Sequence, residues 1–284
     1  MYRSLIKFLL PTTLLVCLLF SAGRVHATEK DRVYKIGIVP QYTPLFIYRH
    51  WRPLIERIGK ETGLRIEIET YKNFKQFGNA LASGEPDFTY LSPYHLVNAR
   101  RSQAYMPLLR DDSRQLIGIV VVPKDSKVKS INDLDGQTLS FPSPNAFAAS
   151  LYLRAYLREK IGLDFKPDYV GTHGNVYRSV ARKLVAAGGG VNSSLASQPE
   201  RLQAALRVLM SIPGVAAHPV AVHKRVPENV YKLFKESFQL MTKDRRGREI
   251  LASVQIPSPV EADYMRDYAF LETLNLEKHR ATNE

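Results

Sequence analysis

From residue 33 onward, apolar runs of strand length alternate with longer amphipathic segments. The first unit has an apolar run from Tyr34 to Val39, an amphipathic stretch from about Phe46 to Lys60 and a second run from Leu64 to Thr70. Repetition of this unit predicts an α/β fold with mostly parallel strands. The first half of the chain is expected to hold strands at 34–39, 64–70, 88–91, 105–109 and 116–122, and helices at 46–60, 74–82 and 93–101.

A polar stretch, Pro123 to Ser126, interrupts the pattern, which then starts again. The second half is expected to hold a capped turn at 130–136, strands at 138–141, near 169, up to 191, at 207–211 and at 219–224, and helices at 145–160, 175–186, 199–205, 228–241 and 249–253. The last elements need an apolar surface on which to pack, so we expect them to return to the first unit. The sequence therefore predicts two lobes joined by a hinge of two crossings, the first with residues 28–122 and 217–284 and the second with 123–216. The residues from about 278 are expected to fray.

The first 27 residues have the pattern of a secretory signal peptide. Arg3 and Lys7 precede an apolar run from Phe8 to Phe20, and small residues ending at Ala27 mark the expected cleavage point. The run is about 13 residues long, shorter than the roughly 20 that a membrane-spanning helix needs, although an uncleaved anchor is the alternative. The pattern thus predicts export to the periplasm.

The composition favours an anionic partner. The formal net charge is +13, and the predicted signal peptide takes three of these charges with it, which leaves +10 and favours anionic ligands. Lys and Arg are spread along the chain without a basic arm, which argues against nucleic acid as a partner.

Cys17 is the only cysteine and is not preceded by the small residues of a lipoprotein signal. Neither a lipid anchor nor a disulfide is therefore expected.

A hydroxyl residue followed by proline stands at three predicted strand exits: Thr43-Pro44, Ser92-Pro93 and Ser143-Pro144. Ser or Thr can cap a helix N-terminus, and proline is tolerated at the first helical position. In an open α/β sheet, helices that follow parallel strands begin at the edge where ligands bind, and their free N–H groups attract anions. Each site taken alone is explained by simple capping, whereas the three together predict an anion-binding edge.

Two glycine-containing segments are further candidates. Gly171 to Asn175 contains His173, which either donates to an oxyanion or caps its own helix. Gly188 to Ser194 contains Asn192 and either approaches a ligand closely or forms a flexible turn. Three tyrosines near the strand exits either contact a ligand or belong to the core; they are Tyr42, Tyr90 and Tyr94.

No catalytic motif supports an enzyme. The chain contains no G-x-S-x-G, H-E-x-x-H, P-loop or G-x-G-x-x-G sequence and no paired metal-ligand spacing. Asp111-Asp112 is a lone acidic pair before an apolar run, and a solvated turn is its better explanation. We therefore expect no catalysis, no bound metal and no cofactor.

Four segments resemble the ABC-transporter substrate-binding proteins for phosphate, phosphite and phosphonate: Ile36 to Pro40, Gly84 to Tyr94, Ser143 to Ser150 and Gly171 to His173. The resemblance implies a type II periplasmic binding protein, with a ligand cleft between two α/β lobes and docking of the closed form on a membrane permease. It also implies ligand contacts from both lobes, made by Tyr42, Thr43, Ser92, Tyr94, Ser143, Asn145, Ala146 and His173.

The chain departs from this family at two places. The run Ser143-Pro144-Asn145-Ala146 offers fewer hydroxyls than is usual there. Where relatives often read Gly-x-Val-Asp-Ala, this chain has the run from Lys183 to Ala187, and Asn192 stands where a carboxylate could hold a ligand amine. The expected ligand is therefore a small oxyanion without an ammonium group, bound by a monomer that serves an ABC transporter. Docking on a membrane sensor, or an enzyme that uses His173 as acid or base, are the alternatives.

Overall fold

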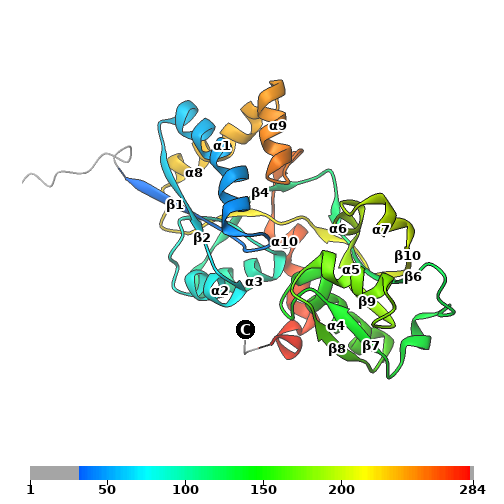
Figure 1. Cartoon of the computed structure of the whole chain (residues 1–284). Helices are drawn as coiled ribbons and strands as arrows, with labels where there is room; N and C mark the ends of the chain where they lie inside the picture. The colour runs from blue at the N-terminus through cyan, green and yellow to red at the C-terminus, as the bar shows by residue number, and fades with distance from the viewer. Residues whose placement is uncertain (1–31, 282–284) are drawn as a thin grey trace, which may run out of the picture.

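Two mixed β-sheets, one in each lobe, organise this computed structural model, which describes residues 32–281 (Figure 1). The first sheet has the strand order β13-β4-β12-β3-β1-β2. Its strands are β1 (Val33–Ile38), β2 (Arg65–Thr70), β3 (Phe88–Tyr90), β4 (Met106–Asp111), β12 (Val220–Val222) and β13 (Pro259–Glu261). Its helices are α1 (Pro44–Thr62), α2 (Phe74–Ala82), α3 (Pro93–Gln103), α8 (Glu228–Met241), α9 (Arg245–Ser253) and α10 (Tyr264–Asp267).

The second sheet has the order β10-β6-β9-β7-β8. Its strands are β6 (Gly118–Pro123), β7 (Thr138–Phe141), β8 (Lys166–Tyr169), β9 (Ala187–Val191) and β10 (Leu206–Ser211). The 3-10 turn η1 (Ile131–Leu134) precedes β7, and a continuous helical stretch follows it as η2 (Phe147–Leu151), α4 (Tyr152–Tyr156) and η3 (Leu157–Ile161). The remaining helices of this lobe are α5 (His173–Ala181), α6 (Asn192–Ala196) and α7 (Glu200–Ala204).

The strand directions differ from the prediction of mostly parallel sheets. β1 is parallel to β2 and β3, and β7 is parallel to β8 and β9. The strands on either side of the crossings, β6, β10 and β12, pair antiparallel with their neighbours, and so does the later strand β13. Both sheets are therefore mixed, because a chain that crosses between lobes and returns must reverse its direction within each sheet.

Helix α1 shows how local sequence sets an element of the first lobe. Thr43 caps its N-terminus, Pro44 occupies the first turn, and Gly63 ends it in the left-handed conformation at φ 75°. Between these ends, apolar residues three or four positions apart form a buried stripe that includes Trp51 and Leu54. The helix therefore packs on the sheet with its N-terminus at the carboxyl end of β1. Within residues 32–281, no helix is long and apolar enough to cross a membrane.

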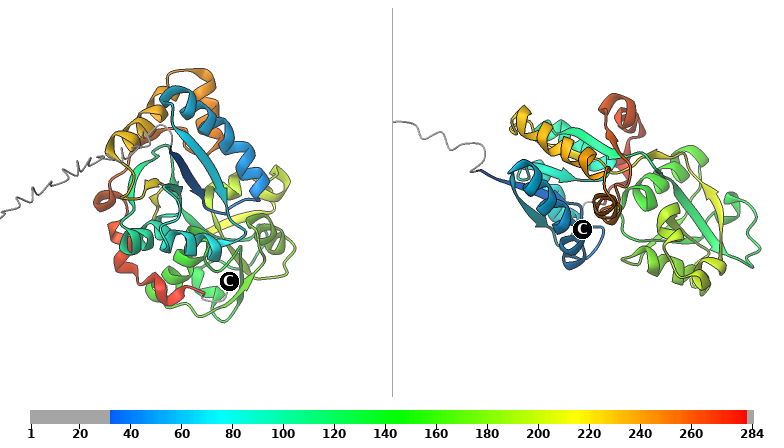
Figure 2. Two further views of the ribbon diagram at one scale, coloured as in Figure 1. Left: turned by 90° about the vertical axis from the view of Figure 1, so that its left-hand side faces the viewer. Right: turned by 90° about the horizontal axis from the view of Figure 1, so that it is seen from above.

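The strand β6 belongs to the second sheet, although its residues up to 122 were expected in the first lobe. A short ribbon of β5 (Gln115–Leu116) and β11 (Val215–Ala216) precedes and follows this lobe in the chain. We therefore propose that the two crossings lie at residues 112–117 and 212–219. The right-hand view of Figure 2 shows the two lobes side by side with these connections between them. The predicted signal peptide, 1–27, lies outside the described residues.

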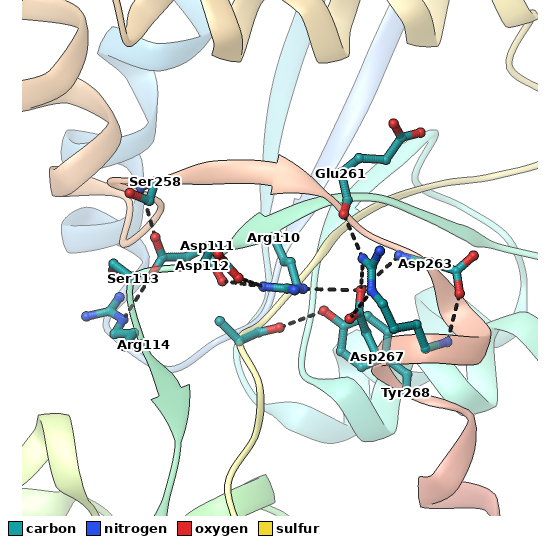
Figure 3. A network of polar contacts seen from close by, with 12 residues as sticks. Arg110, Asp111, Asp112, Ser113, Arg114, Ser258, Glu261, Asp263, Asp267 and Tyr268 are labelled. Atoms are coloured by element: carbon teal, nitrogen blue, oxygen red, sulfur yellow. Dashed lines mark hydrogen bonds and ion pairs between the residues drawn. The ribbon is translucent and has the colours of Figure 1, made fainter.

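A network of ion pairs around the buried carboxylates of Asp111 and Asp267 lies in the first lobe beside the crossings (Figure 3). The Asp267 carboxylate pairs with Arg266 and Arg110, and the Tyr268 hydroxyl donates to the carbonyl of Ala217 at 2.8 Å. Burial acts to raise the pKa of the Asp267 carboxyl. Hydrogen bonds from Arg266, the Asp263 backbone and Arg110 outweigh burial and lower this pKa to about 2. The carboxylate therefore stays charged and holds α10 against β4, while the Tyr268 hydroxyl holds the same part of the chain against the segment that leads back from the second lobe.

Asp111 is part of the same region and is not a solvated turn residue. Its side chain is fully buried at the end of β4 and accepts hydrogen bonds from the Ser258 backbone at 2.9 Å and the Ser113 hydroxyl at 2.6 Å. Arg114 lies 3.6 Å from its second oxygen. Asp111 therefore has a structural role, because its buried carboxylate has three partners and holds β4 to the loop before β13.

The C-terminal segment adds a third passage between the lobes. The 3-10 helix η4 (Ala269–Leu274) packs on α3, and η5 (Leu276–His279) packs on α4. The described residues after 277 do not fray, because the His279 carbonyl accepts from Arg154 at 2.9 Å and the Ala281 backbone pairs with Asn145. These partners lie more than a hundred positions away in the sequence, so residue pattern alone gave no sign of them.

Candidate functional site

Two of the three predicted helix starts are present. The Thr43 hydroxyl accepts from the Phe46 backbone at 3.4 Å, and the Ser92 hydroxyl accepts from the His95 backbone at 3.2 Å. Ser143-Pro144 is not a helix start, because the helical stretch begins only at Phe147 and Ala146 occupies its capping position without a side-chain bond. The sequence signal failed here because a serine followed directly by proline fits an extended loop as well as it fits a helix start.

Ser143 is instead an unsatisfied donor. Its hydroxyl oxygen is buried and has no hydrogen-bond partner among the described residues. A buried hydroxyl without a partner costs free energy, so a group of this kind in a native protein is often completed by a ligand or a water molecule. The loop between β7 and η2 therefore keeps a polar atom available near Asn145.

Ser92 is engaged more tightly than simple capping requires. Its oxygen lies 2.8 Å from Nδ1 of His95, in addition to the backbone bond. Burial, assisted by the charge of Arg280, lowers the pKa of His95 to about 4, so the ring is neutral at pH 7. With the ring proton on Nε2, Ser92 donates to Nδ1; with the proton on Nδ1, the Ser92 proton is free to reach a ligand. The tautomer of His95 thus controls the hydroxyl at this helix start.

A cavity of about 200 Å³ lies where the two lobes meet. Its first-lobe wall comes from α2 and α3 and includes Tyr94 and His95, and its second-lobe wall includes Asn145. Arg280 and Ala281 of the C-terminal segment complete it. Two of the predicted ligand contacts, Tyr94 and Asn145, are thereby brought together from opposite lobes.

Tyr94 presents an unpaired hydroxyl to this region. The side chain is 7% exposed, and no partner among the described residues meets the distance and angle of a hydrogen bond to its oxygen, although Asn98 and the Glu277 carboxylate lie beside it. Burial, together with the nearby Glu277 carboxylate, raises the pKa of Tyr94 well above its ordinary value. The hydroxyl therefore keeps its proton and can donate it to an acceptor in the cavity.

Tyr42 and Tyr90 lie elsewhere, along a second and much smaller cavity. The Tyr42 ring packs against Phe46, and its hydroxyl accepts from Gln255 at 2.9 Å. Tyr90 is 5% exposed, with its ring 5.1 Å from that of Trp51. Of the two explanations given for Tyr90, the structure favours the core.

His173 and Asn192 form a third group, at the carboxyl ends of the second-lobe strands. Nδ1 of His173 lies 3.0 Å from the Ser194 hydroxyl, and Asn192 accepts from the Ile117 backbone at 3.4 Å. The cap of this helix is Thr172, so His173 does not cap its own helix. Desolvation lowers the pKa of His173 to about 4. The ring is neutral at pH 7 and offers a ligand one donor or one acceptor.

The three glycines Gly188 to Gly190 do not form a flexible turn. They lie buried inside β9, with Phe141 packed against Gly189 and Tyr177 packed against Gly190. Side chains from both faces of the sheet fill the space that a Cβ atom would need. The glycines are therefore packing residues of the second-lobe core.

His218 and its partner Gln41 were not predicted. Nε2 of His218 lies 2.8 Å from the Gln41 side chain, and burial, with the charges of His95 and Arg114, lowers its pKa to about 3. The antiparallel pairing of β12 with β3 places this residue at the carboxyl end of β3, where Leu91 bonds to the Pro219 carbonyl. Only knowledge of that pairing could have identified it.

The ten predicted ligand residues thus fall into separate groups and do not line one described cavity. Tyr94 and Asn145 share the cavity between the lobes, and Tyr42 and Tyr90 share the smaller cavity. His173 contacts Ser194, which belongs to the same short helix α6 as Asn192. The described residues 32–281 contain no cluster of three or more His, Cys, Asp or Glu residues that could hold a metal ion.

Comparison with solved structures identifies the architecture. The chain superposes on a binding protein component of an ABC phosphonate transporter from Pseudomonas aeruginosa with a TM-score of 0.72, at 15% identity over 88% of this chain and 89% of that one. PhnD1 from Prochlorococcus marinus, in complex with methylphosphonate, matches with a TM-score of 0.75, at 15% identity over 88% of this chain and 99% of that one. These similarities show the two-lobed periplasmic binding protein fold. No curated protein sequence matches the chain.

A sequence-family model decides the family. The model for the periplasmic substrate-binding protein of phosphonate ABC transporters matches residues 36–268, which include all of both sheets except the first three residues of β1. The resemblance found in the four sequence segments is therefore confirmed. The chain belongs to the family of periplasmic substrate-binding proteins of phosphonate ABC transporters.

Proposed function

We propose that this protein captures a small oxyanion without an ammonium group, of the size of methylphosphonate or phosphite, in the cavity between its lobes. The observation that carries the proposal is the charge of that cavity. Its lining includes the cations Lys75 and Arg280 and contains no Asp or Glu among the described residues. A carboxylate is the group that holds a ligand amine, so this lining favours an anion. The nearest carboxylate is Glu277, which lies beside Tyr94 and 4.0 Å from Arg280 without lining the cavity.

The donors of the site come from both lobes. The unpaired Tyr94 hydroxyl lies on one wall and the Asn145 amide on the other, with the Ser143 hydroxyl unpaired two residues before it. Buried donors without partners bind an oxyanion well because it satisfies them together. Closure of the lobes is proposed to bring His173 and Ser92 to the same ligand. The relative solved with methylphosphonate supports this ligand class.

We further propose that the protein is a monomer, is released into the periplasm by cleavage near Ala27, and delivers its ligand to an ABC permease without altering it. The family of transport proteins to which the chain belongs supports these roles. Incubation of the protein with methylphosphonate, followed by phosphorus NMR, tests the last one. Appearance of any new phosphorus species that depends on His173 would contradict it.

A ligand screen on the protein without its signal peptide tests the ligand class. Methylphosphonate, phosphite, phosphate, sulfate and 2-aminoethylphosphonate are compared by thermal shift and titration calorimetry. A ligand at a hundred times its dissociation constant raises the free energy of unfolding by about 2.7 kcal/mol, which corresponds to a shift of roughly 5–10 °C. We expect methylphosphonate or phosphite to give the largest shift. The proposal fails if no oxyanion shifts the midpoint and a neutral or cationic solute does.

Replacing Tyr94 by phenylalanine should weaken binding of the best oxyanion by about ten-fold, because it removes one donor and keeps the ring. Tyr48→Phe is the matched control, since its hydroxyl lies on an exposed part of α1 away from the cavity. Titration calorimetry measures the affinities of both variants for the oxyanion. Equal affinities for the two variants would remove Tyr94 from the site.

A further inference from the structure

The C-terminal segment is anchored on the second lobe by several specific contacts. Leu276 is 2% exposed, and the His279 carbonyl accepts a hydrogen bond from Arg154 at 2.9 Å. Asn145 makes a two-way pair with Ala281, donating to its carbonyl and accepting from its N–H, each at 3.1 Å. The His279 ring lies 2.9 Å from the Glu159 carboxylate. Residue 280 is therefore fixed between two anchored neighbours.

The anchoring places Arg280 at the cavity between the lobes. Its side chain lines that cavity together with Tyr94 and Asn145. Its charge also reaches the Tyr94 and His95 side chains of α3, and for both groups it acts to lower the pKa. The C-terminal segment, drawn in red in Figure 1, lies beside α4 of the second lobe, and the segment before it lies beside α3. Arg280 thus faces the first lobe from a backbone attached to the second.

The guanidinium of Arg280 is not saturated by protein partners. Its ion pair with Glu277 is at the limit of contact, 4.0 Å, and the side chain is 48% exposed. A guanidinium has five N–H donors in a planar fork, which matches two oxygens of a phosphonate or phosphite. His95 on α3, whose pKa the charge of Arg280 helps to lower, is neutral at pH 7 and so does not compete for the anion by charge.

We propose that Arg280 is a ligand-contacting residue, and that the C-terminal segment completes the oxyanion site with a bidentate cation that neither lobe's own α/β unit supplies. This inference rests on the proposed function and extends it to the residue that selects for negative charge. The alternative use of the same geometry is a plug, in which the segment occupies the space of the ligand. The two roles predict opposite changes in affinity when Arg280 is removed. Binding becomes weaker if Arg280 contacts the ligand and tighter if the segment is a plug.

The test compares Arg280→Gln with Lys278→Gln. Both changes remove one positive charge from the same segment, but Lys278 is exposed and does not line the cavity. Affinities for methylphosphonate, phosphite and phosphate are measured by titration calorimetry on the protein without its signal peptide. We expect Arg280→Gln to weaken binding about ten-fold or more, the effect of losing a charge-assisted pair, and Lys278→Gln to change it less than two-fold. Arg280→Lys should recover part of the loss, because lysine keeps the charge without the fork.

Two results would overturn the inference while leaving the proposed function intact: equal affinities of Arg280→Gln and the unchanged protein, or tighter binding by Arg280→Gln. If the unchanged protein binds none of the three oxyanions, the proposed function fails first and the inference fails with it. Thermal unfolding of each variant without ligand shows whether a loss of affinity comes from a loss of folded protein.

Discussion

Replacing Gly189 by alanine is expected to lower the free energy of unfolding by about 3 kcal/mol, at the upper end of what overpacking a core costs. A Cβ atom at this position would lie 2.5 Å from the Ala149 carbonyl oxygen and 2.5 Å from the Phe141 ring. Neither neighbour can move away easily, because one is backbone and the other is a fully buried ring in the same sheet. Urea unfolding followed by circular dichroism measures the change.

Gly78→Ala is the control for the same substitution in open space. Gly78 lies inside α2, and a Cβ atom there would meet nothing within 4 Å. Alanine has the better helix propensity, so this variant should gain about 0.5–1 kcal/mol. The same substitution should therefore lower the free energy of unfolding at Gly189 and raise it at Gly78. A Gly189→Ala protein as stable as the unchanged one would mean that β9 does not pack as the structure has it.

Acidification from pH 7.5 to 5.0 is expected to destabilise the fold through its desolvated histidines. Burial lowers the pKa of His218 to about 3 in the folded protein, against an ordinary value of 6.5. Below pH 6.5 the unfolded chain therefore binds a proton that the folded protein does not. The stability that the neutral ring provides is complete above pH 6.5 and is lost as the pH falls toward 3. At pH 5.0 the loss from His218 amounts to about 2 kcal/mol.

His95 and His173 act in the same direction, because desolvation lowers the pKa of each to about 4. The variant His218→Gln isolates one contribution, since glutamine can still bond to Gln41 but does not titrate. The difference in unfolding free energy between pH 7.5 and 5.0 should be about 2 kcal/mol smaller in this variant than in the unchanged protein. Urea unfolding of the variant and of the unchanged protein at both pH values gives the four unfolding free energies that this comparison needs. An identical pH difference in the two proteins would show that His218 is not buried in neutral form.

Local pattern predicted the bounds of three elements to the residue. The helices at 74–82 and 228–241 and the strand at 138–141 begin and end as predicted. Apolar spacing and capping residues determine such elements within one or two turns, so no distant contact is needed. The short helix α6 at 192–196 was missed because it buries no residue and therefore has no apolar period.

For the candidate site, too, local sequence and tertiary structure determined different features. By itself the sequence determined the two α/β units, the helix starts at Thr43 and Ser92, the candidate contacts Tyr94 and Asn145, and the family. Only the tertiary structure decided that the glycines of β9 are packing residues and that His218 lies at the carboxyl end of β3. It also decided that Arg280 reaches the cavity, since the pair that anchors it joins residues 136 positions apart. Sequence periodicity reports whether a side chain is buried, but which distant side chain lies next to it depends on how strands pair and lobes pack.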